Sequence, residues 1–292
     1  MKLVMTLLVR DEEDIVNENI AFHLNQGVDH IIATDNGSCD STRSILLKYQ
    51  DAGVLTLLDE PGRDHSQWRW VTRMAVMARD VFNADWVLNN DADEFWVCND
   101  FSLRDFLETN TSDIINVQRK NLCFAWDANN TGHWLDFVKY RMAEPLSFTR
   151  PSDILNPDLP APYFCLDLPT KALLRTQGLT KVWEGNHSGD FDRKAMVSNA
   201  PESVCIYHFP IRSKQQFLTK AVNGGGSYAR NTELPLSYGW HQRYWYDLIQ
   251  KGKIEQALSS ALPDQAYLDT ERDAGRIIED QAIKMILDKI SR

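Results

Sequence analysis

Two aspartates separated by one residue, Asp91 and Asp93, form the pair whose type and spacing best suit chemistry. At the end of a strand, two such carboxylates can approach one hard cation, and oxygen ligands suit Mg²⁺ or Mn²⁺ completed by phosphate and water. An Asp-x-Asp triplet is also common in solvated turns. The apolar runs at 86–88 and 95–97 favour a partly buried edge of a sheet.

The elements that would position this pair are alternating strands and helices in the first hundred residues. Short apolar runs typical of buried strands alternate with amphipathic stretches that begin at acidic or N-cap residues. Repeated units of this kind predict a parallel, doubly wound α/β sheet. Strands are expected at 3–9, 28–34, 54–58 and 85–89, with helices between 11 and 27, 40 and 53, and 66 and 81.

After residue 99 the pattern loosens. A helix at 102–108 and a strand at 114–119 are expected, and six prolines between 121 and 170 predict loops and a few antiparallel strands. Helices are expected again at 213–222, 242–250 and 265–290. Gly224–Gly226 is either a mobile loop over a site or a flexible helix end. Four aromatic residues either stack on a ligand ring or pack the last helices on the sheet: Trp240, Tyr244, Trp245 and Tyr246.

Length and charge exclude several classes of protein. The 292 residues suffice for one large α/β domain or two small ones. The net charge is −10, and residues 1–150 hold 14 basic and 24 acidic side chains, which disfavours binding to nucleic acid or to an anionic membrane. No apolar run reaches the roughly 18 residues of a membrane span. Five scattered cysteines without a Cys-x-x-Cys pair favour a reducing, cytoplasmic location.

Ligands of open parallel sheets bind beyond the carboxyl ends of the strands. Three acidic segments follow expected strands, at 10–12, 35–40 and 90–94, and would meet at one edge. The glycine-rich dinucleotide fingerprint and the Walker A loop are both missing from the sequence. An anion bound at this edge would therefore need another source of positive charge, such as a cation.

These segments resemble the nucleotide-sugar-dependent glycosyltransferases of the GT-A fold, in particular the large bacterial family 2. The likeness rests on residues 9–12, 34–42 and 85–95, with Asp-x-Asp-Glu-Phe at Asp91–Phe95, and on a shorter match at 207–213 followed by Phe217 and Lys220. The resemblance implies a Rossmann-like, mostly parallel sheet with a helical C-terminal cap. It implies a GT-A core at 1–225, with a donor half at 1–100 and an acceptor half at 101–225, and a helical extension at 226–292.

The resemblance also implies roles for matching residues. Asp93 would bind the metal directly, and His208 would complete the metal site or touch the diphosphate. Residues 171–230, with nine basic and four acidic side chains, would close over the phosphates and the acceptor. The implied metal set is Asp91, Asp93 and His208, and the implied nucleotide-sugar set is Arg10, Asp11, Asp35, Gln67, Arg73 and Asp91. Asn36 and Cys39 depart from the family pattern and leave base specificity open.

An inverting transferase needs a general base near the acceptor hydroxyl. The polar segment 183–190, between two expected strands, is the best source of this base. Glu184 is the first choice and Asp190 the second, with His187 as an alternative base or metal neighbour. Glu184 and Asp190 as plain surface turn residues remain the competing interpretation.

The function implied by the resemblance is a metal-dependent glycosyltransferase, with Mn²⁺ or Mg²⁺, acting in bacterial surface-polysaccharide synthesis. It would move a sugar from a nucleoside-diphosphate donor, with UDP-sugars favoured, to a hydroxyl of a carbohydrate or glycolipid acceptor, with inversion. Peripheral membrane association is compatible with this role, and a nucleic-acid partner is not expected. Alternatives are a sugar-nucleotide nucleotidyltransferase, which should carry a glycine-rich basic loop after the first strand, and an inactive sugar-binding module on the same fold.

Overall fold

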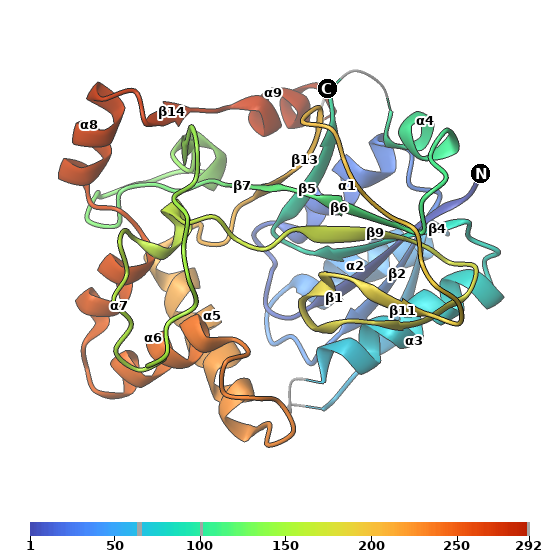
Figure 1. Ribbon diagram of the computed structural model, residues 1–292, viewed down its shortest axis with the longest axis horizontal. Coiled ribbons are helices and arrows are strands. Elements are labelled where there is room, and N and C mark those ends of the chain that lie inside the picture. The colour runs from blue at the N-terminus through green and yellow to red at the C-terminus, as the bar shows by residue number, and fades with distance from the viewer. Residues whose placement is uncertain (63–65, 100–101, 291–292) are drawn as a thin grey trace.

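The computed structural model, which describes residues 1–62, 66–99 and 102–290, is built on a seven-stranded sheet (Figure 1). The strand order is β12-β6-β9-β4-β1-β2-β3. The strands are β1 (Leu3–Val9), β2 (His30–Asp35), β3 (Leu55–Asp59), β4 (Trp86–Asp91), β6 (Ile114–Val117), β9 (Lys171–Arg175) and β12 (Val197–Asn199).

The sheet is mostly parallel. β1 pairs in parallel with β2 and β4, β2 with β3, and β6 with β12, whereas β9 runs antiparallel to both β4 and β6. The insertion of β9 between β4 and β6 is not visible in the local sequence pattern. The predicted α/β class with a doubly wound, mostly parallel sheet and a helical C-terminal cap is confirmed.

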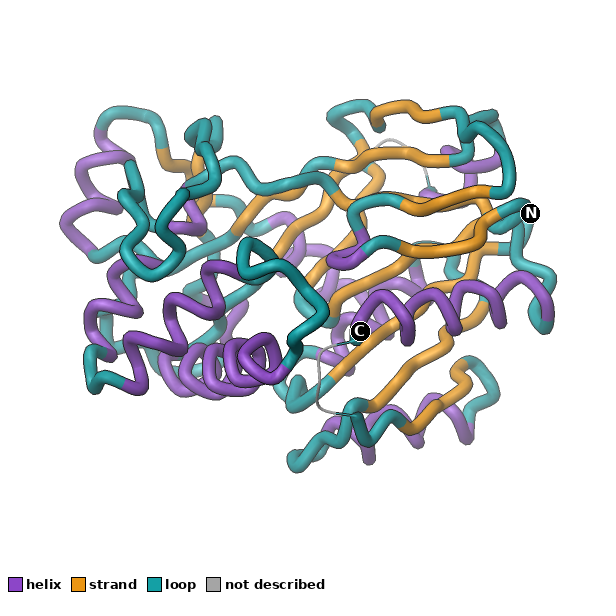
Figure 2. The backbone as a smooth tube through the Cα atoms, turned by 60° about the horizontal axis from the view of Figure 1, so that its bottom comes forward, coloured by secondary structure: helices purple, strands orange, loops and turns teal. Residues whose placement is uncertain are grey.

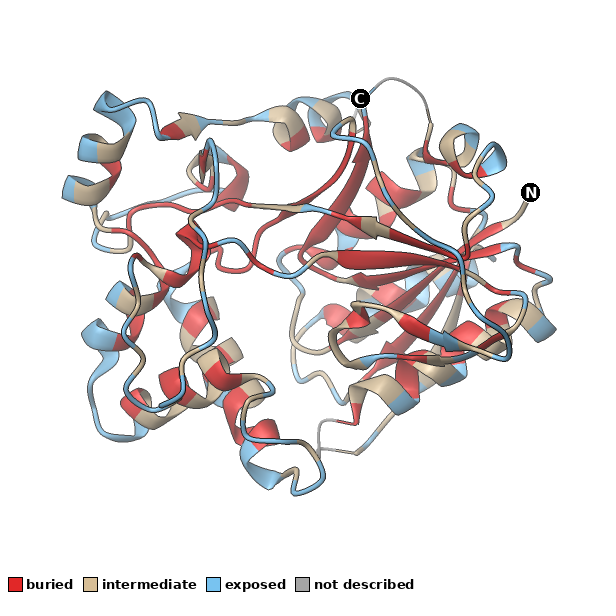
Figure 3. Ribbon diagram, viewed as in Figure 1, coloured by how far each residue is buried: buried red, intermediate tan, exposed pale blue. Residues whose placement is uncertain are grey.

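Helices cover both faces of the sheet. Since successive residues of a strand face opposite ways, the buried strands present apolar side chains on both faces, and each face needs a cover. Leu3, Met5 and Leu7 pack in one apolar cluster with α1 (Val16–Asn25) and α2 (Thr42–Asp51). Val4 instead packs with Val71 and other residues of α3 (Gln67–Asp80) in a second cluster. Figure 3 shows the central strands as the most buried part of the fold.

A smaller three-stranded sheet begins with the strand that follows β4. β5 (Glu94–Cys98) pairs antiparallel with β13 (Val204–His208), which pairs in parallel with β7 (Arg119–Asn121). Two further pairs are β10 (Leu179–Val182) with β11 (Gly189–Phe191), and β8 (Tyr140–Met142) with β14 (Ile277–Glu279). The short helices are α4 (Leu103–Glu108), η1 (Trp134–Asp136), η2 (Tyr163–Cys165) and η3 (Glu184–Asn186).

The last third of the chain supplies the helices α5 (Lys214–Arg230), α6 (Trp240–Gln250) and α7 (Ile254–Ala261), grouped beside the main sheet (Figures 1 and 2). The single helix expected at 265–290 is wrong. The segment divides into α8 (Gln265–Asp273), β14 and α9 (Ala282–Ile290), because Gly275 takes a positive φ of 72° after α8 and residues 277–279 pair with β8.

The expectation of a loop or helix end at Gly224–Gly226 is also wrong. These residues lie within α5, and a Cβ at Gly225 would overlap Tyr246 and lie 2.6 Å from the backbone oxygen of Gln242. The glycines therefore let α5 and α6 approach closely. α5 also runs through residue 225, where a domain boundary is predicted, and the division into domains stays a prediction. In the described part of the chain, no helix is long and apolar enough to cross a membrane.

Candidate active site

A cavity of about 730 Å³ opens where β1 and β4 end, and α5 and α6 line its other side. The residues that line it range along the chain from Leu8 in β1 to Trp245 in α6, so most of the chain contributes to the cavity. Of the eleven residues predicted to bind the nucleotide sugar or the metal or to act as the base, seven line this cavity: Arg10, Gln67, Asp91, Asp93, Glu184, His187 and His208.

The turn between β4 and β5 presents the two aspartates. Asp91 is the last residue of β4, and the backbone carbonyl of Asp93 accepts a hydrogen bond from Phe209 N at 2.8 Å. Asn90 accepts a hydrogen bond from Trp96 Nε1 at 2.8 Å, which fastens one flank of the turn to the other. Buried strands on both sides thus hold a polar turn at the rim, as the apolar flanks predict.

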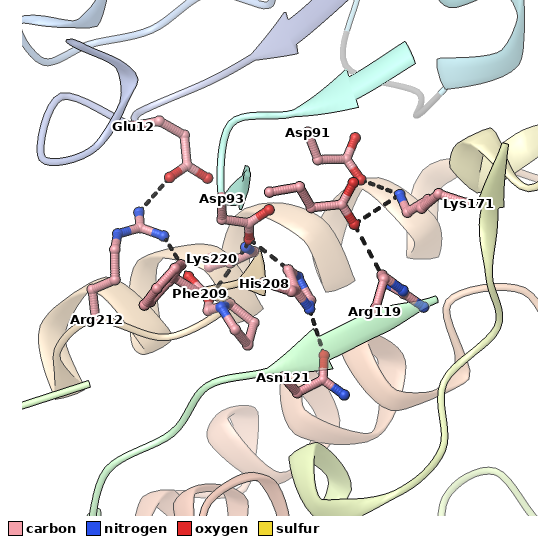
Figure 4. Close-up of polar contacts among 12 residues, drawn as sticks. Glu12, Asp91, Asp93, Arg119, Asn121, Lys171, His208, Phe209, Arg212 and Lys220 are labelled. Atoms are coloured by element: carbon pink, nitrogen blue, oxygen red, sulfur yellow. Dashed lines mark hydrogen bonds and ion pairs between the residues drawn. The ribbon is translucent and has the colours of Figure 1, made fainter. Parts of the chain in front are cut away.

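Asp93 lies in a buried polar cluster (Figure 4). Lys220 Nζ donates a hydrogen bond to Asp93 Oδ2, and His208 Nε2 lies 3.6 Å from the same oxygen. His208 is held at its other nitrogen, since Nδ1 lies 2.8 Å from Asn121 Oδ1. Burial alone would raise the pKa of Asp93, but the charge of Lys220 holds it well below its usual range.

Asp91 belongs to a second cluster (Figure 4). Lys171 Nζ donates to Asp91 Oδ2 at 2.5 Å and lies 3.3 Å from Glu94 Oε1, which is also 3.6 Å from Arg119. Glu94 is fully buried, and burial raises its pKa to about 7, with the charge of Asp91 acting in the same direction and Lys171 opposing it. Lys171 thus bridges the cavity carboxylate to a carboxyl group beneath it.

A buried arginine joins the start of the chain to the α5 side of the cavity. Arg212 donates to Glu12 Oε2, and its Nε donates to Asp14 Oδ2 at 2.7 Å. The guanidinium also donates to the carbonyl of Phe209 at 3.0 Å. Because Glu12 lines the cavity, Arg212 fixes the loop after β1 against the segment that carries Lys220.

The segment at η3 brings Glu184 and His187 to the cavity. Glu184 Oε2 accepts a hydrogen bond from Trp68 N at 3.2 Å, in the first turn of α3. Asn186 Nδ2 donates to Asp91 Oδ1 at 3.2 Å. His187 Nδ1 lies 2.7 Å from the carbonyl of Thr170, and burial lowers the pKa of this histidine to about 4. These contacts hold the amide of Asn186 against Asp91, and the side chains of Glu184 and His187 at the same cavity.

Four predicted site residues are not among the described residues that line the cavity. Asp35 is buried and accepts from Ser38, whereas Asp11 accepts from Cys39 N at 2.7 Å. The other two are Arg73, which lies 3.6 Å from Glu60, and Asp190, an exposed residue that accepts from Trp183 Nε1 at 2.8 Å. Their assigned roles stay predictions.

The structure adds residues that the sequence did not single out. Arg119, Arg150 and Lys171 line the cavity and supply positive charge, and Tyr163 and Phe148 contribute aromatic surface. Lys171 falls within the basic stretch 171–230, which is the one signal that pointed to it.

The aromatic residues of α6 divide between two roles. Trp240 and Trp245 line the cavity, and Tyr163 packs edge-on against both rings with centroids 5.5 and 5.4 Å away. Tyr244 and Tyr246 are not among the described lining residues. The cavity therefore has an aromatic wall beside its charged one.

The described residues do not offer a divalent cation a ready set of ligands. No group of three or more His, Cys, Asp or Glu residues close enough to hold a metal ion occurs among them. Within the predicted metal set, Asp91 and Asp93 are each bound by a lysine, and His208 is the one further metal ligand near Asp93. As folded, Asp91, Asp93 and His208 do not fit the cation that the resemblance implies.

Comparisons with known proteins add distant likenesses of the fold. No protein-family model and no curated protein matches the chain. The crystal structure of S. aureus TarS 1-349 is 13% identical over 88% of this chain and 81% of that chain, with a TM-score of 0.43, and TarS has also been solved with UDP and UDP-GlcNAc. HddC from Yersinia pseudotuberculosis is 12% identical over 75% of this chain and 97% of that chain, with a TM-score of 0.39.

Glucosyl-3-phosphoglycerate synthase from Mycobacterium tuberculosis, solved with Mn²⁺, UDP and phosphoglyceric acid, is 16% identical. That likeness covers 40% of this chain and 43% of the synthase, with a TM-score of 0.28. Since these scores are low, the function is inferred from the residues of the cavity.

Proposed function

We propose that this protein is a glycosyltransferase that moves a sugar from a nucleoside-diphosphate donor to an acceptor hydroxyl. One observation carries the proposal. A single cavity at the carboxyl ends of β1 and β4 holds the Asp91–Asp93 pair, positive side chains and the carboxylate of Glu184, opposite an aromatic wall. This location is where open parallel sheets bind nucleotides.

The charged wall of the cavity suits the donor. Arg10 and Gln67 lie with Asp91 on the β1, α3 and β4 side, where they would contact the nucleoside. Lys171, Lys220 and Arg119 would meet the diphosphate, because ammonium and guanidinium groups form charge-assisted hydrogen bonds with phosphate oxygens. A UDP-sugar is the favoured donor, as the sequence resemblance implies.

The aromatic wall suits a carbohydrate acceptor. Flat aromatic rings such as those of Trp240 and Tyr163 present apolar faces with polar edges, which match the two kinds of surface of a sugar ring. The acceptor in this proposal is the hydroxyl group of a carbohydrate or a glycolipid, in bacterial surface-polysaccharide synthesis.

Glu184 is the general base in this proposal. It would take the proton of the acceptor hydroxyl as the acceptor oxygen bonds to the anomeric carbon with inversion, while the bond from that carbon to the phosphate oxygen breaks and its electron pair leaves on the diphosphate. Asp190 lies outside the cavity and His187 Nε2 packs against Gly185, so Glu184 is better placed than either alternative.

The nucleotidyltransferase alternative is less well supported. The loop after β1 carries Glu12, which is paired with Arg212, in place of a glycine-rich basic loop that could cradle a triphosphate. An inactive sugar-binding module would share the cavity and is distinguished by turnover.

A thermal-shift screen with UDP-, GDP-, CMP- and dTDP-sugars, each with and without Mn²⁺, tests the proposal. A ligand at about 100 times its Kd adds about 2.7 kcal/mol to the free energy of unfolding, which corresponds to roughly 5 °C in a protein of this size. Arg10→Met, which removes a proposed contact with the nucleoside, should reduce the shift, and Asp190→Asn, outside the cavity, should not. The absence of a shift with every donor, or an equal effect of both variants, contradicts the proposal.

A further inference from the structure

Each carboxylate of the Asp91–Asp93 pair is bound by a lysine that also lines the cavity. Lys171 Nζ binds Asp91 Oδ2 at 2.5 Å, and Lys220 Nζ binds Asp93 Oδ2. The lysines come from β9 and α5, which approach the β4–β5 turn from different directions (Figure 4). One oxygen of each aspartate is therefore already matched with a positive charge supplied by the chain.

Lys220 competes directly for the oxygen that a metal would need. The oxygen that it binds, Asp93 Oδ2, is the one that faces His208 Nε2 at 3.6 Å. A cation shared by Asp93 and His208 would have to approach this oxygen and displace the ammonium group. Lys220 is also held by the carbonyl of Pro210 at 3.2 Å, so its displacement would break a second hydrogen bond.

The lysines can do for a diphosphate what a bridging cation does. Two bare carboxylates would repel a diphosphate, and a cation between them normally removes that repulsion. An ammonium group has three N–H donors. Asp93 and Pro210 use two of those of Lys220, which leaves one for a phosphate oxygen in the cavity.

We infer that Lys171 and Lys220 take the place of a divalent cation at this site, so that the diphosphate of the donor binds without metal. This inference rests on the proposed function. Lys220 contacts the diphosphate and stabilises its negative charge as the bond to the sugar breaks. Lys171 neutralises Asp91 and keeps it from repelling the same phosphates. The metal dependence predicted from the sequence is replaced by two built-in ammonium groups.

A Mn²⁺ titration followed by electron paramagnetic resonance is the first test, on the metal-stripped full-length protein with and without UDP. We expect the signal of free Mn²⁺ to be no lower than that of the matching protein-free solution at every ratio, since UDP itself binds Mn²⁺ in both and Asp93 is occupied by Lys220. Uptake of about one Mn²⁺ per chain that Asp93→Asn abolishes would overturn the inference. This readout needs neither turnover nor the lysine variants.

Calorimetric titration with UDP and with inorganic pyrophosphate, in the presence of EDTA, is the second test. Both ligands should bind with unchanged affinity in EDTA, and Lys220→Met should weaken both about 10- to 100-fold, the size of one charge-assisted hydrogen bond. Lys214→Met is the matched control, since Lys214 lies on the same helix, is exposed and does not line the cavity.

Two outcomes contradict the inference here: loss of binding in EDTA that Mn²⁺ restores, or wild-type affinity in Lys220→Met. If pyrophosphate binds as expected while no nucleoside diphosphate does, the proposed function fails and the role of the lysines as a phosphate site stands. The two proposals are thus separable.

Discussion

Lys220 donates a hydrogen bond to the carboxylate of Asp93, although the two residues lie 127 positions apart in the chain. The backbone of Asp93 is held from the same region, because its carbonyl accepts from Phe209 N at 2.8 Å. The segment from β13 to α5 therefore positions Asp93 through both its backbone and its side chain. The Asp-x-Asp turn is shaped by residues that follow it by more than a hundred positions.

The Asp93–Lys220 pair should contribute a measurable coupling energy. Asp93→Asn and Lys220→Met should each destabilise the fold, and the double variant should cost less than the sum, by about 1 to 2 kcal/mol. The reason is that Asp93→Asn leaves the half-buried charge of Lys220 without its carboxylate, and Lys220→Met leaves the buried charge of Asp93 without its ammonium group. Urea unfolding of the four proteins measures this difference. Strict additivity would show that the pair is not formed in solution.

Replacement of Glu184 by glutamine should remove catalysis and spare binding. The Glu184→Gln variant would keep a side-chain oxygen for Trp68 N, so the η3 segment stays in place, but its amide cannot accept the acceptor's proton. The rate of UDP release should fall about 10²- to 10⁴-fold with the Kd of UDP unchanged. Asp190→Asn is the control, and a collapse of turnover in that variant with Glu184→Gln active would reassign the base to Asp190.

Adjacent glycines of α5 should respond oppositely to alanine. A Cβ at Gly225 would overlap Tyr246, so Gly225→Ala should lower the free energy of unfolding by about 1 to 3 kcal/mol as α6 is pushed away. The nearest atom to a Cβ at Gly226 is 3.4 Å away, on the flexible side chain of Arg230. Gly226→Ala should therefore be neutral or stabilise α5 by up to about 1 kcal/mol. Similar melting temperatures for the two variants would disprove the close approach of α5 and α6.

Acid should destabilise the fold through His23. Burial lowers the pKa of this histidine to about 4, from 6.5, and its ring is fixed as a neutral tautomer with Nδ1 at 2.8 Å from the carbonyl of Asn19 and Nε2 accepting from Trp96 N at 3.3 Å. Between these pKa values the unfolded chain binds more protons, so stability is lost as the pH falls from 6.5 to 4.

The loss assigned to His23 is at most about 3.5 kcal/mol, since its pKa falls by about 2.5 and one pKa unit corresponds to about 1.4 kcal/mol. Urea unfolding between about pH 4 and pH 7 measures it, and His23→Gln should show a shallower pH dependence than the wild type. His133→Gln, at an exposed histidine, should reproduce the wild-type slope. An unchanged slope in His23→Gln would mean that the acid sensitivity arises elsewhere.

Local patterns predict the first hundred residues well because each strand and helix there carries its own signal. Apolar runs mark β1 to β4, and the apolar flanks of Asp91–Asp93 indicate a buried turn. The C-terminal segment 265–290 fails because its amphipathic period continues across β14, whose strand character comes from pairing with β8.

The candidate site is predicted only in part for the same reason. Asp91, Asp93 and Glu184 stand in recognisable local contexts and reach the cavity. Lys171 is marked only by the basic stretch 171–230 and Arg119 by no local signal, since their roles arise from ion pairs with residues far away in the chain. Gly224–Gly226 misleads because glycine favours loops, while here it permits close packing of two helices.

The position of β9 in the chain determines when, during synthesis, β4 gains its second neighbouring strand. β4 pairs with β9 over Trp86–Leu88, yet β9 begins at residue 171, about 80 residues after β4 ends. Synthesis of these residues takes roughly 4 to 16 s at about 5 to 20 residues per second. During that interval one edge of β4 has open backbone groups and apolar side chains, a template for aggregation. Strand β9 closes that edge and delivers Lys171 to Asp91 in the same step, so the protection of β4 from aggregation coincides with the neutralisation of a cavity carboxylate.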